Sequence, residues 1–318
     1  MADNEIQPSM TAEQLRAGWK PRRVGRRIVV LAETESTNTL ALAAADEPDS
    51  DGLAIFADAQ TAGRGRLGAT WVSPRGASVL CSVVLLEEDE DAAAGKDSDS
   101  TSRGLQPARS SASEEASERV QDSARAEACG SLGENELRPL FRVSAWLTHV
   151  SAVAACDAIR QAVAITPAIK WPNDLHIGGR KVGGILIETR PVDANTRAWV
   201  VGVGINCLQH AGHFPPELRE SATSLELVTH NPIDRTAVAR ELLKSLDRRL
   251  VPEMWGRTEE AHRDWLAYAE PLGQKVRLRR DGQDYTGWTV EVDPVGGLMV
   301  RLDTGRLEWF DPMRTKLL

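Results

Sequence analysis

The amino-acid sequence predicts an α+β fold with a larger domain over residues 28–269 and a small all-β domain over residues 270–318. In the larger part, short apolar runs typical of strands alternate with longer segments whose apolar residues have helical spacing. After Pro271-Leu272-Gly273 the pattern changes to short alternating runs separated by turns such as Asp281-Gly282 and Gly296-Gly297. The C-terminal part is therefore predicted to be a small antiparallel barrel of SH3-like size.

Length and composition indicate a globular protein. The chain has 318 residues, of which 42% are hydrophobic. A chain of this length is expected to form about two domains. It contains neither an apolar run of the ~18–20 residues needed to span a bilayer nor the basic and apolar start of a secretory signal. The four cysteines have no CxxC spacing, which argues against a zinc site and a disulfide framework. We therefore expect a cytoplasmic location and no membrane partner.

The net charge of −8 belongs to one segment. Residues 87–138 hold 14 acidic and 6 basic residues, which leaves 32 of each sign in the rest of the chain. The same segment has nine serines and no aromatic residue. Because it cannot bury enough apolar area to offset its chain entropy, it is predicted to be a disordered insertion in a surface loop. A spacer role is favoured over regulation by serine phosphorylation.

Residues 1–27 are polar and are predicted to form a flexible N-terminal arm. They end in a basic cluster, consisting of Lys20, Arg22, Arg23, Arg26 and Arg27. A nucleic-acid patch is the alternative reading, but the arm is too short and polar to hold a helix-turn-helix. No DNA partner is therefore expected.

The first strand, at 28–31, is predicted to be buried and leads to Ser36-Thr37-Asn38 and an Ala/Leu helix over 39–45. Ser, Thr and Asn just before a helix are N-cap residues. Hydroxyl groups at such a strand-to-helix junction can also point into a cleft and bind a polar ligand. Both interpretations remain open for Ser36 and Thr37.

A second strand, at 53–57, runs into a cationic glycine-rich loop, Gly63-Arg64-Gly65-Arg66-Leu67-Gly68. Backbone N–H groups and guanidinium groups in such a loop can both donate to phosphate. The loop lacks the ending of a Walker A motif and the acidic ribose partner of a Rossmann fingerprint. Trp71 either forms an aromatic wall for a ring or belongs to the core.

After a strand at 77–86 and a helix over 140–165, the chain reaches a predicted hairpin with a lysine on each limb. The first limb carries Lys170 before Trp171-Pro172-Asn173-Asp174, the turn is Gly178-Gly179, and the second limb carries Lys181 before two more glycines. A cation beside adjacent glycines suits close approach of backbone to a ligand. His149, on the helix, is predicted to be a core or edge histidine.

The strand predicted at 198–207 has glycines at alternate positions, Gly202 and Gly204, so one of its faces is bare where a flat ligand or backbone can approach. A helix capped by Asp234 and a second helix over 255–268 follow. His210 and His213 have no further metal ligands nearby in the sequence.

Five groups of residues, taken together, resemble the biotin protein ligase family in type and order. They are Ser36-Thr37-Asn38, Gln60-Thr61-Ala62-Gly63-Arg64-Gly65-Arg66 with Trp71, Lys170-Trp171-Pro172-Asn173-Asp174, Arg180-Lys181-Val182-Gly183-Gly184-Ile185-Leu186 and Gly202-Val203-Gly204-Ile205-Asn206. The resemblance covers residues 28–318 except the insertion at 87–138.

The resemblance implies a catalytic domain related to class II aminoacyl-tRNA synthetases, with a mixed sheet flanked by helices, before the SH3-like barrel. It implies a ligase that uses ATP and Mg²⁺ to activate biotin as biotinyl-5′-AMP. The biotinyl group then passes to a lysine of a biotin carboxyl carrier domain of an acyl-CoA carboxylase. A monomer or weak homodimer is expected.

The resemblance also implies roles for individual residues. The catalytic residues are Lys170, Arg64 and Arg66. The biotin site contains Ser36, Thr37, Asn38, Gln60, Arg64, Gly65, Arg66, Lys170, Gly183, Gly184, Ile185 and Gly204. The last four of these are expected to form the floor under the apolar rings of biotin. The ATP site contains Arg66, Trp71, Lys170, Asn173, Lys181 and Asn206. No resident metal is implied, because Mg²⁺ arrives with ATP, and Asp174 either orients Lys170 or coordinates that ion.

Two departures from the family pattern bear on regulation. Some members carry an N-terminal DNA-binding helix-turn-helix, which residues 1–27 cannot supply, and residue 69 is alanine where regulatory members can have arginine. The closest rival activity is that of a lipoate protein ligase, against which the Arg64–Arg66 loop and the Lys170 motif argue. A rival of another class is a non-enzymatic regulator or adaptor.

Overall fold

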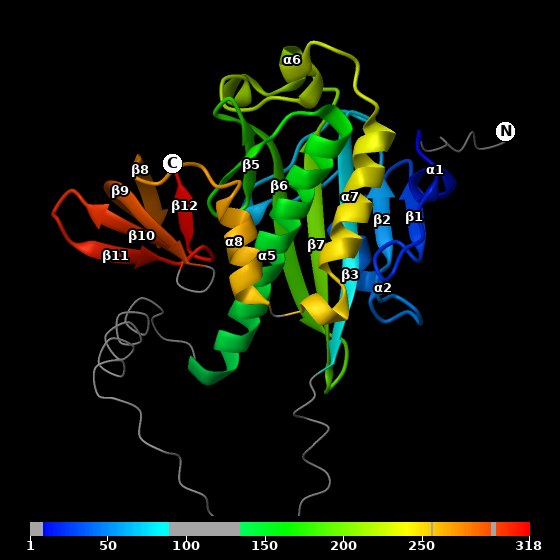
Figure 1. Ribbon diagram of the computed structural model, residues 1–318, viewed down its shortest axis with the longest axis horizontal. Helices are drawn as coiled ribbons and strands as arrows, with labels where there is room; N and C mark the ends of the chain where they lie inside the picture. The colour runs from blue at the N-terminus through cyan, green and yellow to red at the C-terminus, as the bar shows by residue number, and fades with distance from the viewer. Residues whose placement is uncertain (1–8, 89–133, 256, 294–296) are drawn as a thin grey trace, which may run out of the picture. The chain divides into compact units, whose positions relative to one another are not determined.

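A computed structural model describes residues 9–88, 134–255, 257–293 and 297–318 (Figure 1). The chain divides into two compact units. One unit joins the residues up to 87 to residues 142–270, and the other includes residues 271–318.

The first unit contains a mixed seven-stranded sheet with the order β1-β2-β3-β7-β6-β5-β4. β1 and β2 pair in parallel, whereas β2–β3 and the successive pairs from β4 to β7 are antiparallel. The strands are β1 (Ile28–Leu31), β2 (Ala54–Ala57), β3 (Ser78–Glu88), β4 (Ala168–Lys170), β5 (Asp174–Ile177), β6 (Arg180–Pro191) and β7 (Thr196–Asn206). The predicted strands and the predicted hairpin are thus confirmed, except that β1 is half-buried because it lies at the sheet edge.

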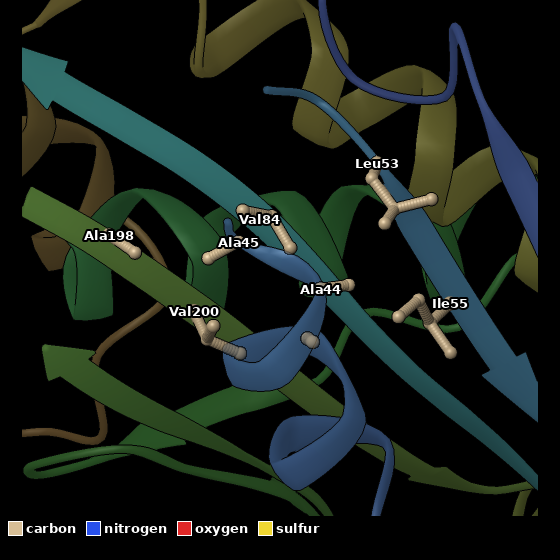
Figure 2. Close-up of a cluster of buried hydrophobic side chains, with 8 residues drawn as sticks. Ala44, Ala45, Leu53, Ile55, Val84, Ala198 and Val200 are labelled. Carbon is tan, nitrogen blue, oxygen red and sulfur yellow. The ribbon is translucent and has the colours of Figure 1, made fainter. Parts of the chain in front are cut away.

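Helices cover both faces of this sheet. The α-helices that the structure describes are α1 (Ala12–Arg16), α2 (Thr37–Ala44), α5 (Glu134–Val163), α6 (Leu225–Thr229), α7 (Arg235–Arg249) and α8 (Thr258–Leu266). Figure 2 shows Ala44 and Ala45, at the end of α2, beside Val84, Ala198 and Val200 on the sheet. α5 and α7 lie across the opposite face (Figure 1). None of the helices that the structure describes is both long enough and apolar enough to cross a membrane.

Residues 9–27 pack against the first unit, so the prediction of a flexible arm is wrong for this part of the chain. The capping box of Thr11 and Gln14 begins α1, and Leu15 and Val24 are fully buried. The backbone N–H groups of residues 22, 23 and 24 donate to the carboxylate of Asp247 on α7, at 2.7–3.1 Å. The basic cluster is also partly structural, because the Arg23 guanidinium is buried and pairs with Asp51 at 2.7 Å.

The predicted insertion at 87–138 begins later and ends earlier in the sequence than its composition suggests. Glu87, placed inside it by the sequence, is part of β3, and its two carboxylate oxygens accept from Trp199 Nε1 at 2.6 Å and Trp255 Nε1 at 3.1 Å. At the other end, α5 begins at Glu134 instead of residue 140. The remainder of the predicted disordered segment, residues 89–133, lies outside the described residues.

Replacing residues 89–133 with a flexible Gly/Ser linker is expected to change the free energy of unfolding by less than about 0.5 kcal/mol, because the anchored residues on either side remain. The substitution Glu87→Ala in the full chain is instead expected to cost about 2 kcal/mol, since two indole N–H groups lose their acceptor. Urea unfolding followed by tryptophan fluorescence measures both. A linker variant as unstable as Glu87→Ala would contradict this account.

His149 lies on α5 and packs against α8, as the core prediction requires. It is 5% exposed, and its ring stacks on Trp265 with centroids 4.9 Å apart. Burial, together with the nearby His262, lowers the pKa of His149 to about 3. The histidine is therefore neutral in the folded protein at neutral pH.

This lowered pKa predicts a loss of stability in mild acid. The unfolded chain binds a proton at its ordinary pKa of 6.5, whereas the folded chain does not. The stability that comes from keeping His149 neutral is therefore fully present above pH 6.5, and it is lost progressively as the pH decreases from 6.5 toward 3. Between pH 7.5 and pH 5 the unfolding free energy of the wild type should fall by about 2 kcal/mol more than that of His149→Phe. Parallel urea titrations at the two pH values test this, and equal losses would contradict it.

The second unit contains an antiparallel five-stranded sheet with the order β11-β10-β9-β8-β12. Its strands are β8 (Lys275–Arg280), β9 (Gln283–Asp293), β10 (Gly297–Leu302), β11 (Leu307–Phe310) and β12 (Thr315–Leu317). Leu278, Val300 and Phe310 are fully buried on its inner side. The large mixed sheet and this second sheet confirm the predicted α+β class.

Candidate active site on the glycine face of the large sheet

One row of residues crosses four strands of the large sheet. Lys170 pairs with Asp174, Asp174 with Gly184, and Gly184 with Gly204. Because directly paired residues point to the same face, Lys170 and Asp174 lie at one end of this face and the glycines Gly184 and Gly204 lie at the other. We call it the glycine face. The structure thus brings together the hairpin and the glycine strand that the sequence singled out separately.

Two of the predicted floor residues point the other way. Gly183 pairs with Ile205, and Ile185 pairs with Val203, so both alternate to the face opposite Gly184. The Ile185 side chain is 2% exposed, within the core. Only Gly184 and Gly204 of the predicted floor therefore present their bare side to the glycine face, since successive residues of a strand alternate.

Two side chains of the protein lie against the glycines of β7. A Cβ atom on Gly204 would be 2.7 Å from Cζ2 of Trp71, and one on Gly202 would be 2.2 Å from Oδ1 of Asn38. Both distances are far below van der Waals contact, so each glycine makes room for a specific side chain. The sequence predicted that a flat ligand or backbone approaches this strand, whereas the groups that lie against it in the structure are the side chains of Trp71 and Asn38.

The start of α2 is held by Gln60. Gln60 Oε1 accepts from the Thr37 backbone N–H at 2.7 Å and from Thr37 Oγ1 at 3.1 Å. Ser36 occupies the N-cap position but makes no side-chain cap bond. The capping interpretation of Ser36 is therefore wrong, because the acceptor that caps this helix comes from the glycine-rich segment.

The loop between β2 and β3 is closed by its own backbone. Gly65 N–H donates to the Ala69 carbonyl at 2.7 Å, and Trp71 N–H donates to the Gly63 carbonyl at 2.9 Å. Two of its arginines reach toward the sheet: Arg64 Nη2 donates to Glu188 Oε2 at 2.8 Å, and Arg66 Nη1 donates to Asn173 Oδ1 at 2.9 Å. The cationic loop and the hairpin are thus neighbours in space, although about a hundred residues separate them in the sequence.

Asn173 connects this loop to β6. Its Nδ2 donates to the Ile185 carbonyl at 2.6 Å, while the Ile185 N–H donates to the Asn173 carbonyl at 3.0 Å. The Asn173 side chain is 8% exposed. It therefore fixes the position of Arg66 from a rigid, buried place.

The two hairpin lysines differ in their partners. Lys181 Nζ pairs with Asp174 Oδ1 at 2.7 Å and lies 5.9 Å from the centroid of the Trp71 ring. Lys170 forms no ion pair with any carboxylate in the part of the chain that the structure describes. Asp174 thus orients Lys181 and not Lys170, which corrects one of the two roles considered for it.

Lys170 nonetheless acts on its surroundings. The pKa of Glu270 is lowered chiefly by its hydrogen bond with His176, and electrostatic interactions with His176 and Lys170 lower it further against the opposing effect of burial. The Lys170 ammonium is thus close enough to interact with the Glu270 carboxylate, without forming a direct ion pair with it among the described residues.

Asn206 lies at the end of β7, where its polar atoms bind the protein itself. Its Nδ2 donates to the Thr223 carbonyl at 3.0 Å, and its Oδ1 accepts from Gln209 Nε2 at 2.9 Å. The side chain is 5% exposed. These bonds give it a structural role at the end of the strand.

Glu188 is the site residue that the sequence reasoning missed. It lies on β6, four residues after Gly184, and residues an even number apart in a strand share a face. The sequence alone could therefore have placed Glu188 on the same face as Gly184. Among the described residues, no group of three or more His, Cys, Asp or Glu side chains could hold a metal ion.

Comparisons with known proteins agree with this arrangement. The biotin/lipoate A/B protein ligase family model matches residues 30–98 and 132–206, which include most of the glycine face. The bifunctional ligase/repressor BirA of Bacillus subtilis (strain 168) is 27% identical over 296 residues, covering 93% of this chain and 76% of that protein. The biotin–[acetyl-CoA-carboxylase] ligase of Mycobacterium tuberculosis is 29% identical over 295 residues, covering 91% of this chain and 85% of that protein.

A solved structure supports the fold. The biotin protein ligase from Aquifex aeolicus in complex with biotin and ATP superposes with a TM-score of 0.62 at 22% identity, covering 92% of this chain and 99% of that one. The family model covers the loop, the hairpin and the glycine strand, and the full-length relatives are ligases of the same family. Residues 30–98 and 132–206 of this chain thus match the model of the biotin/lipoate A/B protein ligase family.

Proposed function

We propose that this chain is an ATP-dependent biotin protein ligase. The observation that carries the proposal is the row from Lys170 to Gly204, which places a cation on the same face as two glycines, the second of which lies against the Trp71 ring. Relatives that align along most of the chain are named as biotin–[acetyl-CoA-carboxylase] ligases. Biotin combines a carboxylate with apolar fused rings, which matches this combination of charge and bare backbone.

The reaction has two steps. A carboxylate oxygen of biotin attacks the α-phosphorus of ATP, and the bond to pyrophosphate breaks, giving biotinyl-5′-AMP. The amine of a carrier lysine, after losing a proton, then attacks the acyl carbon, and the bond to AMP breaks. An amide forms and AMP leaves.

Lys170 is proposed to bridge the two reacting anions of the first step. The biotin carboxylate and the α-phosphate repel each other, so a fixed cation between them lowers the cost of bringing them together. The same cation stabilises the charge that accumulates at phosphorus in the transition state. Its lack of an ion-pair partner among the described residues leaves its ammonium ready for these groups.

The other cations are proposed to hold the phosphates and the adenylate. Arg64 and Arg66 would donate from the loop, and Lys181 would bind phosphate by exchanging its bond to Asp174. Trp71 would cover the ligand, with Asn173 and Asn206 on the nucleotide side. Thr37, Asn38 and Gln60, at the start of α2, would face the polar ureido end of biotin together with Ser36 and Gly65.

Mg²⁺ is proposed to arrive with ATP, where it neutralises phosphate charge. The donor set fits this view, because Mg²⁺ is commonly held by one or two carboxylates together with substrate phosphates. Asp174 is a carboxylate on the glycine face that could join such a set when Lys181 turns to phosphate.

Further properties follow from the family. The first unit is proposed to have the class II synthetase-like architecture, and the second sheet to close as an SH3-like barrel. The protein substrate is proposed to be a biotin carboxyl carrier domain of an acyl-CoA carboxylase, modified in the cytoplasm by a monomer or weak homodimer without DNA binding.

The test is ATP–pyrophosphate exchange with biotin and lipoate in parallel. Exchange that depends on biotin, with little or none for lipoate, is the expected result. Exchange with lipoate alone would identify a lipoate protein ligase instead. No exchange with either acid would favour the non-enzymatic regulator.

A further inference from the structure

We propose that Glu188 is a positioning residue that holds Arg64 over the glycine face by tying it to Asn38. The inference rests on the proposed function for its catalytic consequence. Its structural part concerns the glycine-rich loop alone.

A single carboxylate oxygen joins the loop to α2. Glu188 Oε2 accepts from Arg64 Nη2 at 2.8 Å and from Asn38 Nδ2 at 2.7 Å. The two donors belong to different segments of the sequence, the glycine-rich loop and α2, and β6 supplies the acceptor that binds both. The carboxylate therefore connects Arg64 to the helix start, in addition to the bonds between Gln60 and Thr37 nearer to β2.

The Asn38 side of this connection is rigid. Asn38 is 4% exposed, and its Oδ1 accepts from Ser82 Oγ at 2.5 Å. Its amide also lies directly on Gly202, where a Cβ atom would be 2.2 Å away. Since Asn38 is fixed from two other directions, its position does not depend on Glu188.

The Arg64 side is adjustable. The Arg64 side chain is 42% exposed and belongs to a short loop, whereas the Glu188 side chain is 26% exposed. A half-exposed ion pair of this kind contributes little to global stability. Its main effect is to restrict where the Arg64 guanidinium lies, and a restricted cation binds an anion at a lower entropic cost than a free one.

The experiment compares Glu188→Ala and Glu188→Gln with the wild type in biotin-dependent ATP–pyrophosphate exchange. Glu188→Ala is expected to raise KM for biotin about tenfold with kcat changed less than about threefold, because the loss falls on positioning. Glu188→Gln keeps an acceptor oxygen and should recover most of this loss. An unchanged KM in Glu188→Ala would overturn the inference.

A double-mutant cycle separates positioning from a direct role. If Glu188 acts through Arg64, adding Glu188→Ala to Arg64→Ala should raise KM by less than about twofold further. A full additional tenfold rise would overturn the inference. Asp46→Ala is the matched control, because it removes the 2.7 Å ion pair of Arg190 on the same strand and should leave KM unchanged.

Hydrogen exchange of residues 63–71 makes the outcome independent of the proposed function. Glu188→Ala and Arg64→Ala are both expected to increase exchange in this loop, whereas Asp46→Ala is not. If the wild type catalyses no ATP–pyrophosphate exchange with biotin or lipoate, the proposed function fails, while hydrogen exchange in the loop still decides whether Glu188 positions Arg64. If the wild type catalyses biotin-dependent ATP–pyrophosphate exchange but hydrogen exchange in the loop is unchanged in Glu188→Ala, the positioning role alone fails.

Discussion

Replacing Lys170 with alanine is expected to lower biotin-dependent adenylate formation about 10²–10³-fold. The residue lies in the row with Asp174 and Gly184, and no carboxylate that the structure describes neutralises it by an ion pair. Its removal leaves two anions to approach each other without a cation between them. ATP–pyrophosphate exchange measures the loss, and thermal unfolding should show a folded protein.

The matched control for this variant is Lys20→Ala, which removes an exposed lysine of the same unit. It should exchange at the wild-type rate. Near-normal exchange by Lys170→Ala would contradict the assignment. In that case Lys181, the other lysine on this face, would become the residue to test, and Lys181→Ala should then show the larger loss.

The substitution Asp247→Ala is expected to lower the free energy of unfolding by about 3–4 kcal/mol. The Asp247 carboxylate is 2% exposed and accepts from three successive backbone N–H groups at residues 22–24. Alanine leaves these donors buried without an acceptor. Urea unfolding measures the loss, and hydrogen exchange should locate it in residues 9–27.

Asp234→Ala is the control for Asp247→Ala, because it removes a carboxylate that accepts from only one backbone N–H, that of Ala237, at the start of the same helix. Loss of an exposed N-cap costs about 1 kcal/mol. If Asp247→Ala were no more harmful than Asp234→Ala, residues 9–27 would not depend on this anchor.

The secondary structure of the large sheet was predictable because its signals are local. The apolar runs at β2, β3 and β7 and the turn at Gly178-Gly179 each fall within a few residues. The same holds for Asp234, whose side chain caps α7 as expected. Elements of this kind need no knowledge of distant partners.

The N-terminal segment was mispredicted because its anchor is distant in the sequence. Residues 22–24 look polar and solvated, and the Asp247 carboxylate that binds them lies more than two hundred residues away. Glu87 was assigned to the insertion for a similar reason, since its acidic neighbours hide the indole partners supplied by Trp199 and Trp255.

The site was predictable in its residue types and less so in its pairings. The sequence indicated the cations of the loop and hairpin and the bare strand. It did not reveal that Asp174 pairs with Lys181 or that Glu188 receives Arg64. It also assigned Ile185 to the ligand side, which only the strand register could correct.

The most direct test of the central claim is transfer to protein. The purified chain is incubated with ATP, Mg²⁺, a biotin carboxyl carrier domain and either biotin or lipoate, and the carrier is examined by intact-mass spectrometry and peptide mapping. The account predicts one biotinyl group on a single carrier lysine, dependent on ATP and lost in Lys170→Ala. Transfer of lipoate in preference to biotin, or no transfer of either, would contradict it.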